Sequence, residues 1–159
     1  MKYLIYKSYL TAIENSVGVK LFRNFFARNE ETGETEDILK DGQRSCASHT
    51  SSILYLYGLI SSPHATVDGL IRDLEKNGWQ KTEEPFPGAV LIWEKKMIAN
   101  KENMHAGFYL AKENGEDITV SNNSSSKIPV KHHWTFGLDK NGNPSRKIIA
   151  IYQHPCFFI

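Results

Sequence analysis

Several features that would place this chain in a specialised class are missing from its 159 residues. The net charge is only +1, and no run of lysine and arginine exceeds two residues, so no basic patch for nucleic acid or an anionic membrane is expected. No apolar stretch approaches the ~20 residues that a membrane-spanning helix needs. The two cysteines, Cys46 and Cys156, are too few for a small disulfide-rich scaffold.

Signals for targeting, nucleotides and metals are also scarce. The apolar run within residues 1–7 is shorter than the roughly 7–15 residues of a signal-peptide core. We therefore expect a cytoplasmic protein, or one exported by a route that the sequence does not show. No glycine-rich phosphate loop occurs, which argues against nucleotide-dependent chemistry. Cys46 and His49, together with His132 and His133, form neither a Cys-x-x-Cys nor a His-Glu-x-x-His spacing, so neither a metal nor another cofactor is expected.

What is present is the composition of an ordinary globular domain. Hydrophobic residues make up 40% of the chain and charged residues 23%. The length is sufficient for one domain with a substantial core. Because no internal repeat or clear linker is found, we expect residues 1–159 to form a single domain.

Helical periodicity is confined to the first half of the chain. Apolar residues at helical spacing predict helices over residues 3–16, 46–60 and 66–77, with Ser45 and Thr66 at the N-cap positions of the last two. Residues 19–27 are compatible with a strand or a helix. Residues 28–42 are polar and predict a loop with at most a short strand.

Strand patterns dominate after Trp79. We expect strands over residues 89–94, 105–111, 117–121, 132–137 and 147–152, with turns at Asn114-Gly115 and Asn141-Gly142. Helices followed by a meander of strands predict the α+β class, with the N-terminal helices packed on an antiparallel β-sheet.

Cys46 is the first candidate for chemistry because it lies at the predicted start of a helix. A helix N-terminus carries partial positive charge and free N–H groups, which lower the pKa of a thiol and favour the nucleophilic thiolate. The same N–H groups can stabilise an oxyanion when a thiolate attacks a carbonyl. The alternative is a small, inert cysteine buried in the first turn of a core helix.

His105 is the candidate base for this thiol. It begins the predicted strand 105–111 beside the small residues Ala106 and Gly107, so a thiol can approach its ring. A surface histidine at a strand edge is the alternative interpretation. Six histidines in the chain also make some pairing with a cysteine expected by chance.

A third polar group is needed to hold the imidazole in one tautomer. The predicted strand 117–121 returns across the Asn114-Gly115 hairpin, and the residues that follow it come back beside His105. Asn122 has the same strand parity as the apolar residues expected to face the helices, which favours it as the orienting group. Ser121 and Asn123 are its rivals, and a simple polar turn is the alternative.

Three segments together resemble a known family: Ser45-Cys46-Ala47-Ser48, Pro87-Gly88-Ala89-Val90-Leu91-Ile92-Trp93 and His105-Ala106-Gly107-Phe108-Tyr109-Leu110. This order is similar to the NlpC-type cell-wall cysteine peptidases and their CHAP amidase relatives, within the papain-like superfamily. The resemblance implies a papain-like fold and no metal. It also implies that Cys46 is the nucleophile, His105 the base and Asn122 the orienting residue.

The activity implied by this resemblance is hydrolysis of peptide or amide bonds, with peptidoglycan stem peptides as the expected substrate. Two alternatives stay open. One is acyl transfer by the same thiol, and the other is a binding module that no longer turns over. The second is motivated by the residues around Cys46, since Ser45-Cys46-Ala47-Ser48 stands where the family usually has Asp-Cys-Ser-Gly. Ala89 also stands where the family usually has aspartate. The family offers no counterpart for residues 132–136 and 151–155.

Overall fold

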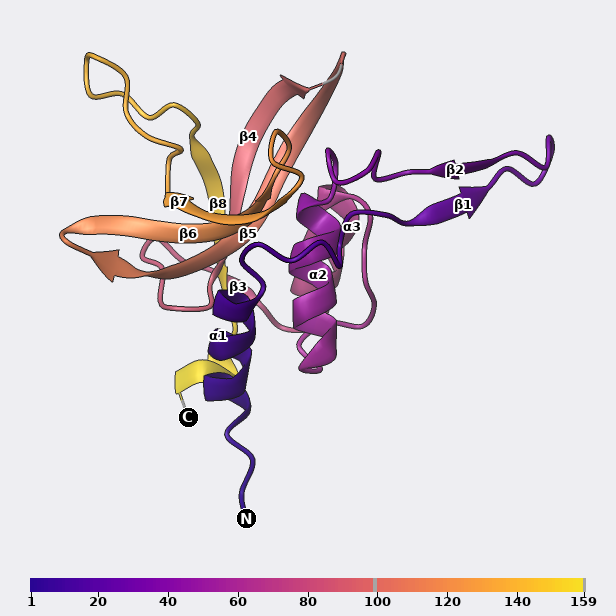
Figure 1. Ribbon diagram of the computed structural model, residues 1–159. Helices are drawn as coiled ribbons and strands as arrows, with labels where there is room; N and C mark the ends of the chain where they lie inside the picture. The colour runs from indigo at the N-terminus through magenta and orange to yellow at the C-terminus, as the bar shows by residue number, and fades with distance from the viewer. Residues whose placement is uncertain (99, 159) are drawn as a thin grey trace.

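The computed structural model describes residues 1–98 and 100–158 (Figure 1). Its helices are α1 (Ile5–Asn15), α2 (Cys46–Leu56), α3 (Val67–Lys76) and the 3-10 helix η1 (Pro155–Phe158). Its strands are β1 (Phe26–Arg28), β2 (Thr35–Asp37), β3 (Gln80–Lys81), β4 (Val90–Ile98), β5 (Lys101–Glu113), β6 (Glu116–Asn123), β7 (Ile128–His133) and β8 (Ile148–Gln153). The order of helices and strands gives a mixed α+β fold, as the sequence predicts.

The main sheet has six strands in the order β3-β8-β4-β5-β6-β7, and every neighbouring pair is antiparallel. β4 to β7 form the expected meander. The last predicted strand does not continue it, because β8 returns to the other edge of β4 and lies between β4 and β3. β1 and β2 pair separately in a hairpin that projects away from the sheet (Figure 1).

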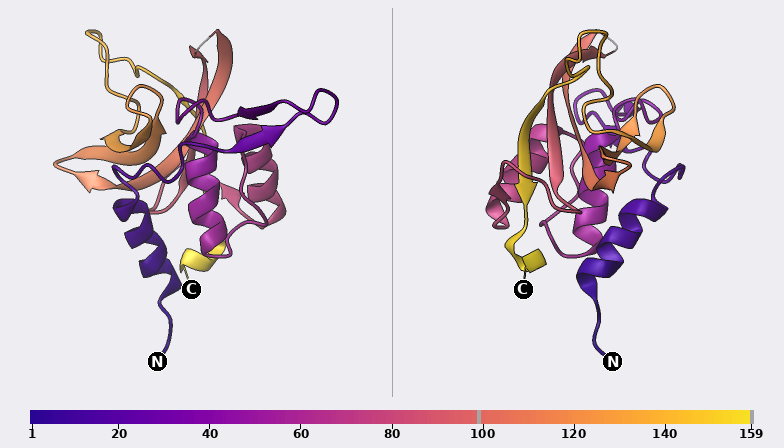
Figure 2. Two further views of the ribbon diagram at one scale, coloured as in Figure 1. Left: turned by 45° about the vertical axis from the view of Figure 1, so that its right-hand side comes forward. Right: turned by 90° about the vertical axis from the view of Figure 1, so that its left-hand side faces the viewer.

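The three α-helices contribute to one core on one face of the sheet. α2 lies in the middle of this layer, against α1, α3, β5 and β6. Its buried residues meet Phe108 and Val120 of the sheet, and α1 adds Tyr9 and Ile13. A smaller cluster that includes Trp93 and Tyr109 covers the other face. Both views of Figure 2 show the two ends of the chain at the same end of the molecule, away from the β1–β2 hairpin.

The helix ends agree with the prediction in part. α3 lies within the predicted range 66–77, and the Thr66 hydroxyl caps it by accepting a hydrogen bond of 3.2 Å from the Gly69 N–H. α2 begins at Cys46 as expected but ends four residues early, at Leu56. Ser45 occupies its N-cap position without capping it, and among the described residues its buried hydroxyl has no hydrogen-bond partner.

The strand boundaries differ from the prediction at His105 and after His133. β5 begins at Lys101, so His105 lies inside the strand and not at its start, because β4 and β5 continue to pair as far as Ile98 and Lys101. β7 ends at His133, whereas the prediction placed a strand over residues 132–137. Residues 134–137 instead belong to a turn in which Phe136 has a φ of 61°.

None of the helices within residues 1–98 and 100–158 combines the length and the apolar character required to cross a membrane.

Candidate active site

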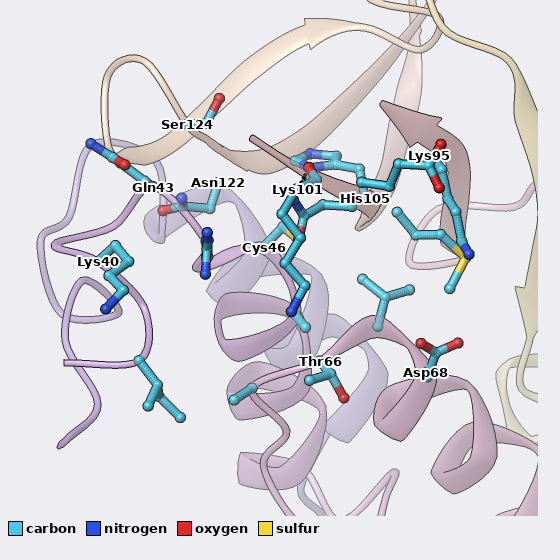
Figure 3. A pocket seen from close by; sticks show the side chains of 18 of the residues that line it. Lys40, Gln43, Cys46, Thr66, Asp68, Lys95, Lys101, His105, Asn122 and Ser124 are labelled. Carbon is cyan, nitrogen blue, oxygen red and sulfur yellow. Dashed lines mark hydrogen bonds between the residues drawn. The ribbon is translucent and has the colours of Figure 1, made fainter. Parts of the chain in front are cut away.

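A pocket of about 490 Å³ opens where the N-terminus of α2 faces β5 and β6. Cys46, His105 and Asn122 all line it, so the fold brings the three predicted site residues to one cavity. Figure 3 shows their side chains around this space, with Thr66 and Asp68 of the α3 N-terminus on the opposite side.

A tight turn delivers Cys46 to the pocket. Lys40, Asp41 and Gly42 all have positive φ, at 52°, 52° and 87°. Gly42 is required there for a second reason, since a Cβ at this position would lie 2.6 Å from the carbonyl oxygen of Lys127. The Lys127 ammonium also pairs with the Asp41 carboxylate at 3.0 Å. The turn before α2 is therefore fastened to the β6–β7 turn.

Asn122 strengthens this attachment. Its Nδ2 donates a hydrogen bond of 2.7 Å to the carbonyl oxygen of Gly42. The side chain thus faces the helix layer, as its parity predicts, but it does not reach His105. The predicted contact between Asn122 and His105 is absent from the described part of the chain, and Asn122 positions the loop before Cys46 instead of the imidazole.

The residue that contacts His105 is Ser121, the rival in the prediction. His105 Nε2 lies 2.8 Å from Ser121 Oγ. The reason is strand alternation: His105 shares a face with Gly107 and Tyr109, opposite to the face of Ala106 that meets the helices. Gly107 allows the close approach of β6, because a Cβ there would lie 2.5 Å from the Ser121 Cβ.

The hydrogen bonds beyond Ser121 determine the tautomer of His105. Ser121 Oγ lies 2.7 Å from His132 Nε2, and His132 Nδ1 lies 2.8 Å from the carbonyl oxygen of His133. A carbonyl oxygen only accepts, so neutral His132 carries its proton on Nδ1 and accepts at Nε2. The Ser121 hydroxyl then donates to His132 and accepts from His105 Nε2–H. This leaves His105 Nδ1 unprotonated, and no described residue forms a hydrogen bond with it.

The thiol of Cys46 is neutral at rest. Burial raises its pKa above the ordinary value, although the backbone N–H groups of Ala106 and Ala47 and the charge of Arg146 act in the opposite direction. The expectation that the helix N-terminus lowers this pKa is therefore wrong for the resting site, because desolvation of the thiolate outweighs the local dipoles.

His105 is also neutral at rest. Its side chain is buried against the rings of Trp93 and Phe136, whose centroids both lie 5.3 Å from its own. Burial holds its pKa well below the ordinary value, and the charge of Arg146 lowers it further. The imidazole therefore stays available as a proton acceptor at pH values where a free histidine is protonated.

Arg146 is a buried cation next to this pair. Its guanidinium donates to the carbonyl oxygen of Glu94 at 3.0 and 2.9 Å and to that of Asn103 at 2.8 Å. It also lies over the Phe136 ring, 5.9 Å from the centroid. Arg146 favours a thiolate at Cys46 and disfavours an imidazolium at His105. Arg146 could not be singled out from the sequence, because it lies in a polar segment before a strand.

Within the described residues, no group of three or more histidine, cysteine, aspartate and glutamate side chains is arranged to hold a metal ion. Comparison with models of known families, with curated proteins and with solved structures finds no match for this chain.

Proposed function

We propose that the protein is a cysteine hydrolase that cleaves peptide or amide bonds, with Cys46 as nucleophile and His105 as base. The observation that supports it best is the shared pocket of Cys46 and His105, in which Ser121 holds His105 Nε2 and no described residue forms a hydrogen bond with Nδ1. A base that accepts protons at one nitrogen and is fixed at the other is what thiol activation requires. In this proposal Ser121 takes the orienting role that the sequence assigned to Asn122, and His132 supports it.

The reaction begins from the neutral pair. As the sulfur attacks the carbonyl carbon, His105 Nδ1 takes the thiol proton, and the new C–S bond places negative charge on the carbonyl oxygen. The N–H groups of Cys46 and Ala47, at the N-terminus of α2, are suited to stabilise that oxyanion. The imidazolium then returns its proton to the departing amine as the C–N bond breaks, leaving a thioester on Cys46.

Water completes the cycle. His105 Nδ1 removes a proton as the water oxygen attacks the thioester, and the proton passes to the departing sulfur. The products are a carboxylic acid, an amine and the neutral thiol. The resemblance to NlpC-type peptidases favours peptidoglycan stem peptides as the substrate.

The test is product analysis on a peptide panel. Muropeptides and unrelated peptide amides are incubated with protein carrying Cys156→Ser, which removes the exposed second thiol, and products are identified by mass spectrometry. We expect cleavage that depends on Cys46 and falls by about 100-fold or more in His105→Asn, the usual range for loss of a general base. Products joined to an added amine would indicate acyl transfer. Binding without any Cys46-dependent product would contradict the proposal and favour a binding module.

A further inference from the structure

Arg44 is a cation without a carboxylate partner, two residues before Cys46. Its side chain lines the pocket that holds Cys46 and His105. Among the described residues its guanidinium forms no hydrogen bond, and its Nε is buried without a partner. The positive charge of Arg44 helps to lower the pKa of Glu36, but the Glu36 carboxylate binds the Lys40 ammonium at 2.7 Å and forms no ion pair with Arg44.

Asn122 adds an acceptor without a donor in the same pocket. The residue is 2% exposed, and its Nδ2 is used by the Gly42 carbonyl. Its Oδ1 is buried and has no hydrogen-bond partner among the described residues. A buried donor and a buried acceptor that both lack partners are costly, and a ligand that satisfies both recovers that cost.

The remaining charges of the pocket are distributed unevenly. Figure 3 shows Lys40 and Asn122 on one side of Cys46, and Asp68 on the other side beside α3. Lys101 lies between these two sides in the same view, near Cys46 and His105. On the first of these sides Glu36 neutralises Lys40 through their 2.7 Å ion pair, so the unpaired positive charge there is that of Arg44. An anionic group is therefore favoured beside Arg44 and Asn122, away from Asp68.

We propose that Arg44 binds a carboxylate of the substrate, while Asn122 Oδ1 accepts a hydrogen bond from the N–H of the amide next to that carboxylate. A guanidinium binds a carboxylate through paired, charge-assisted hydrogen bonds, and an amide N–H beside that carboxylate matches an orphan carbonyl oxygen. The chemical class is an acylated acidic amino acid or an acidic peptide. The proposal deepens the hydrolase proposal by naming its substrate class.

The experiment compares two reagents with the same leaving group and different charge. Cys46 is alkylated by iodoacetate and by iodoacetamide in Cys156→Ser protein, and the ratio of the two rates is referred to that of a free thiol. We expect the ratio in the parent protein to exceed the free-thiol ratio by about tenfold, equivalent to ~1.4 kcal/mol of preference for the anion. Arg44→Gln should bring the ratio to that of a free thiol. Arg72→Gln, an exposed arginine outside the pocket, is the matched control and should change nothing.

A second measurement tests the proposal if the Cys46 thiol reacts with neither reagent. The Arg44 Nε–H signal, identified by its loss in Arg44→Gln, is followed by NMR during titration with N-acetylglutamate and with N-acetylglutamine. We expect a saturable shift with N-acetylglutamate alone. An unchanged alkylation ratio in Arg44→Gln, or the absence of that shift, would overturn the carboxylate site. Neither measurement needs turnover. If the protein binds the anion but cleaves no peptide, the hydrolase proposal is wrong and the carboxylate site still stands.

Discussion

His105 Nε2 and Ser121 Oγ lie 2.8 Å apart, and this contact decides which nitrogen of the imidazole can accept a proton. The direction of this hydrogen bond is determined by the next contacts in the network, from Ser121 to His132 and from His132 Nδ1 to the carbonyl oxygen of His133. A backbone carbonyl cannot change its role, so the chain of hydrogen bonds from His133 through His132 and Ser121 has one direction while His132 is neutral. The availability of His105 Nδ1 as a proton acceptor is therefore a consequence of the backbone of β7.

The tautomers are directly measurable. In protein with ¹⁵N-labelled histidine, we expect His105 to carry its proton on Nε2 and His132 on Nδ1 at pH 7, because of the hydrogen bonds to Ser121 and to the His133 carbonyl. Ring nitrogen shifts from long-range ¹H–¹⁵N NMR spectra report each site, with assignments from His105→Asn and His132→Gln. A proton on His105 Nδ1 would show that the direction is reversed.

Acid should reverse this chain through His132. Burial lowers the pKa of His132, the largest effect on it, and protonation makes both of its nitrogens donors. Ser121 then accepts from His132, and its own proton has no acceptor among the described residues except His105 Nε2. Donation to Nε2 moves the His105 proton to Nδ1 and removes the proton acceptor there. We expect the rate of Cys46 acylation by 4-nitrophenyl acetate to fall as pH drops through this lowered pKa, below 6.5.

The matched variant for this pH effect is His132→Gln, since a glutamine carbonyl accepts from Ser121 but does not titrate. We expect its acylation rate at pH 7 to stay within about threefold of the parent rate, with the decline moved to lower pH. A decline at the same pH in both proteins would show that another group is responsible.

Ser121→Ala removes the acceptor that orients His105. We expect Cys46 acylation at pH 7 to slow by about tenfold, because the imidazole then samples the inactive tautomer. This is less than the roughly 100-fold or greater loss expected when the base itself is removed. Ser125→Ala, at an exposed serine of the following turn, should leave the rate unchanged. Urea unfolding of both variants checks that the fold is retained. A parent-like rate in Ser121→Ala would show that His105 does not depend on the hydrogen bond with Ser121.

Stability should also depend on pH, through His49. This side chain is buried in α2, its Nδ1 has no partner among the described residues, and burial lowers its pKa from 6.5 to about 3. The unfolded chain therefore binds one more proton than the folded chain between these pH values, so stability is lost as pH falls from 6.5 toward 3. The contribution of one histidine is up to about 1.4 kcal/mol per pH unit.

Urea unfolding at a series of pH values between neutral and mildly acidic conditions tests this dependence. His49→Leu should flatten the slope by the contribution of that one histidine, even if the lost bond to Ser16 lowers stability at every pH. Equal slopes in the two proteins would mean that His49 does not titrate in this way.

Local signals in the sequence were sufficient for much of the fold. The cap at Thr66 and the apolar stripe after it predict α3 closely, and Asn114 and Gly115 form the expected hairpin turn with φ of 51° and 85°. The position of β8 was beyond reach, because its pairing with β4 joins segments more than fifty residues apart and depends on no local pattern.

The sequence predicted site residues only where the residue type and its place in a predicted element both indicated a role. Cys46 begins α2, and His105 faces the same pocket, as the sequence predicts. The error at Asn122 came from applying strand parity to β6 but not to β5: the alternation that turns Ala106 toward the helices turns His105 away from them, toward Ser121. Arg146 could not be found this way, since three bonds to carbonyl oxygens hold it and none is visible in a sequence.

The most direct test of the account is the acylation rate of Cys46 at pH 7 with and without its base. Protein carrying Cys156→Ser is mixed with 4-nitrophenyl acetate, and the acetyl group on Cys46 is followed by mass spectrometry and by release of 4-nitrophenol. We predict that His105→Asn lowers this rate by about 100-fold or more while the urea midpoint shows a folded protein, because a neutral thiol needs His105 Nδ1 to remove its proton. Equal rates with and without His105 would contradict the account.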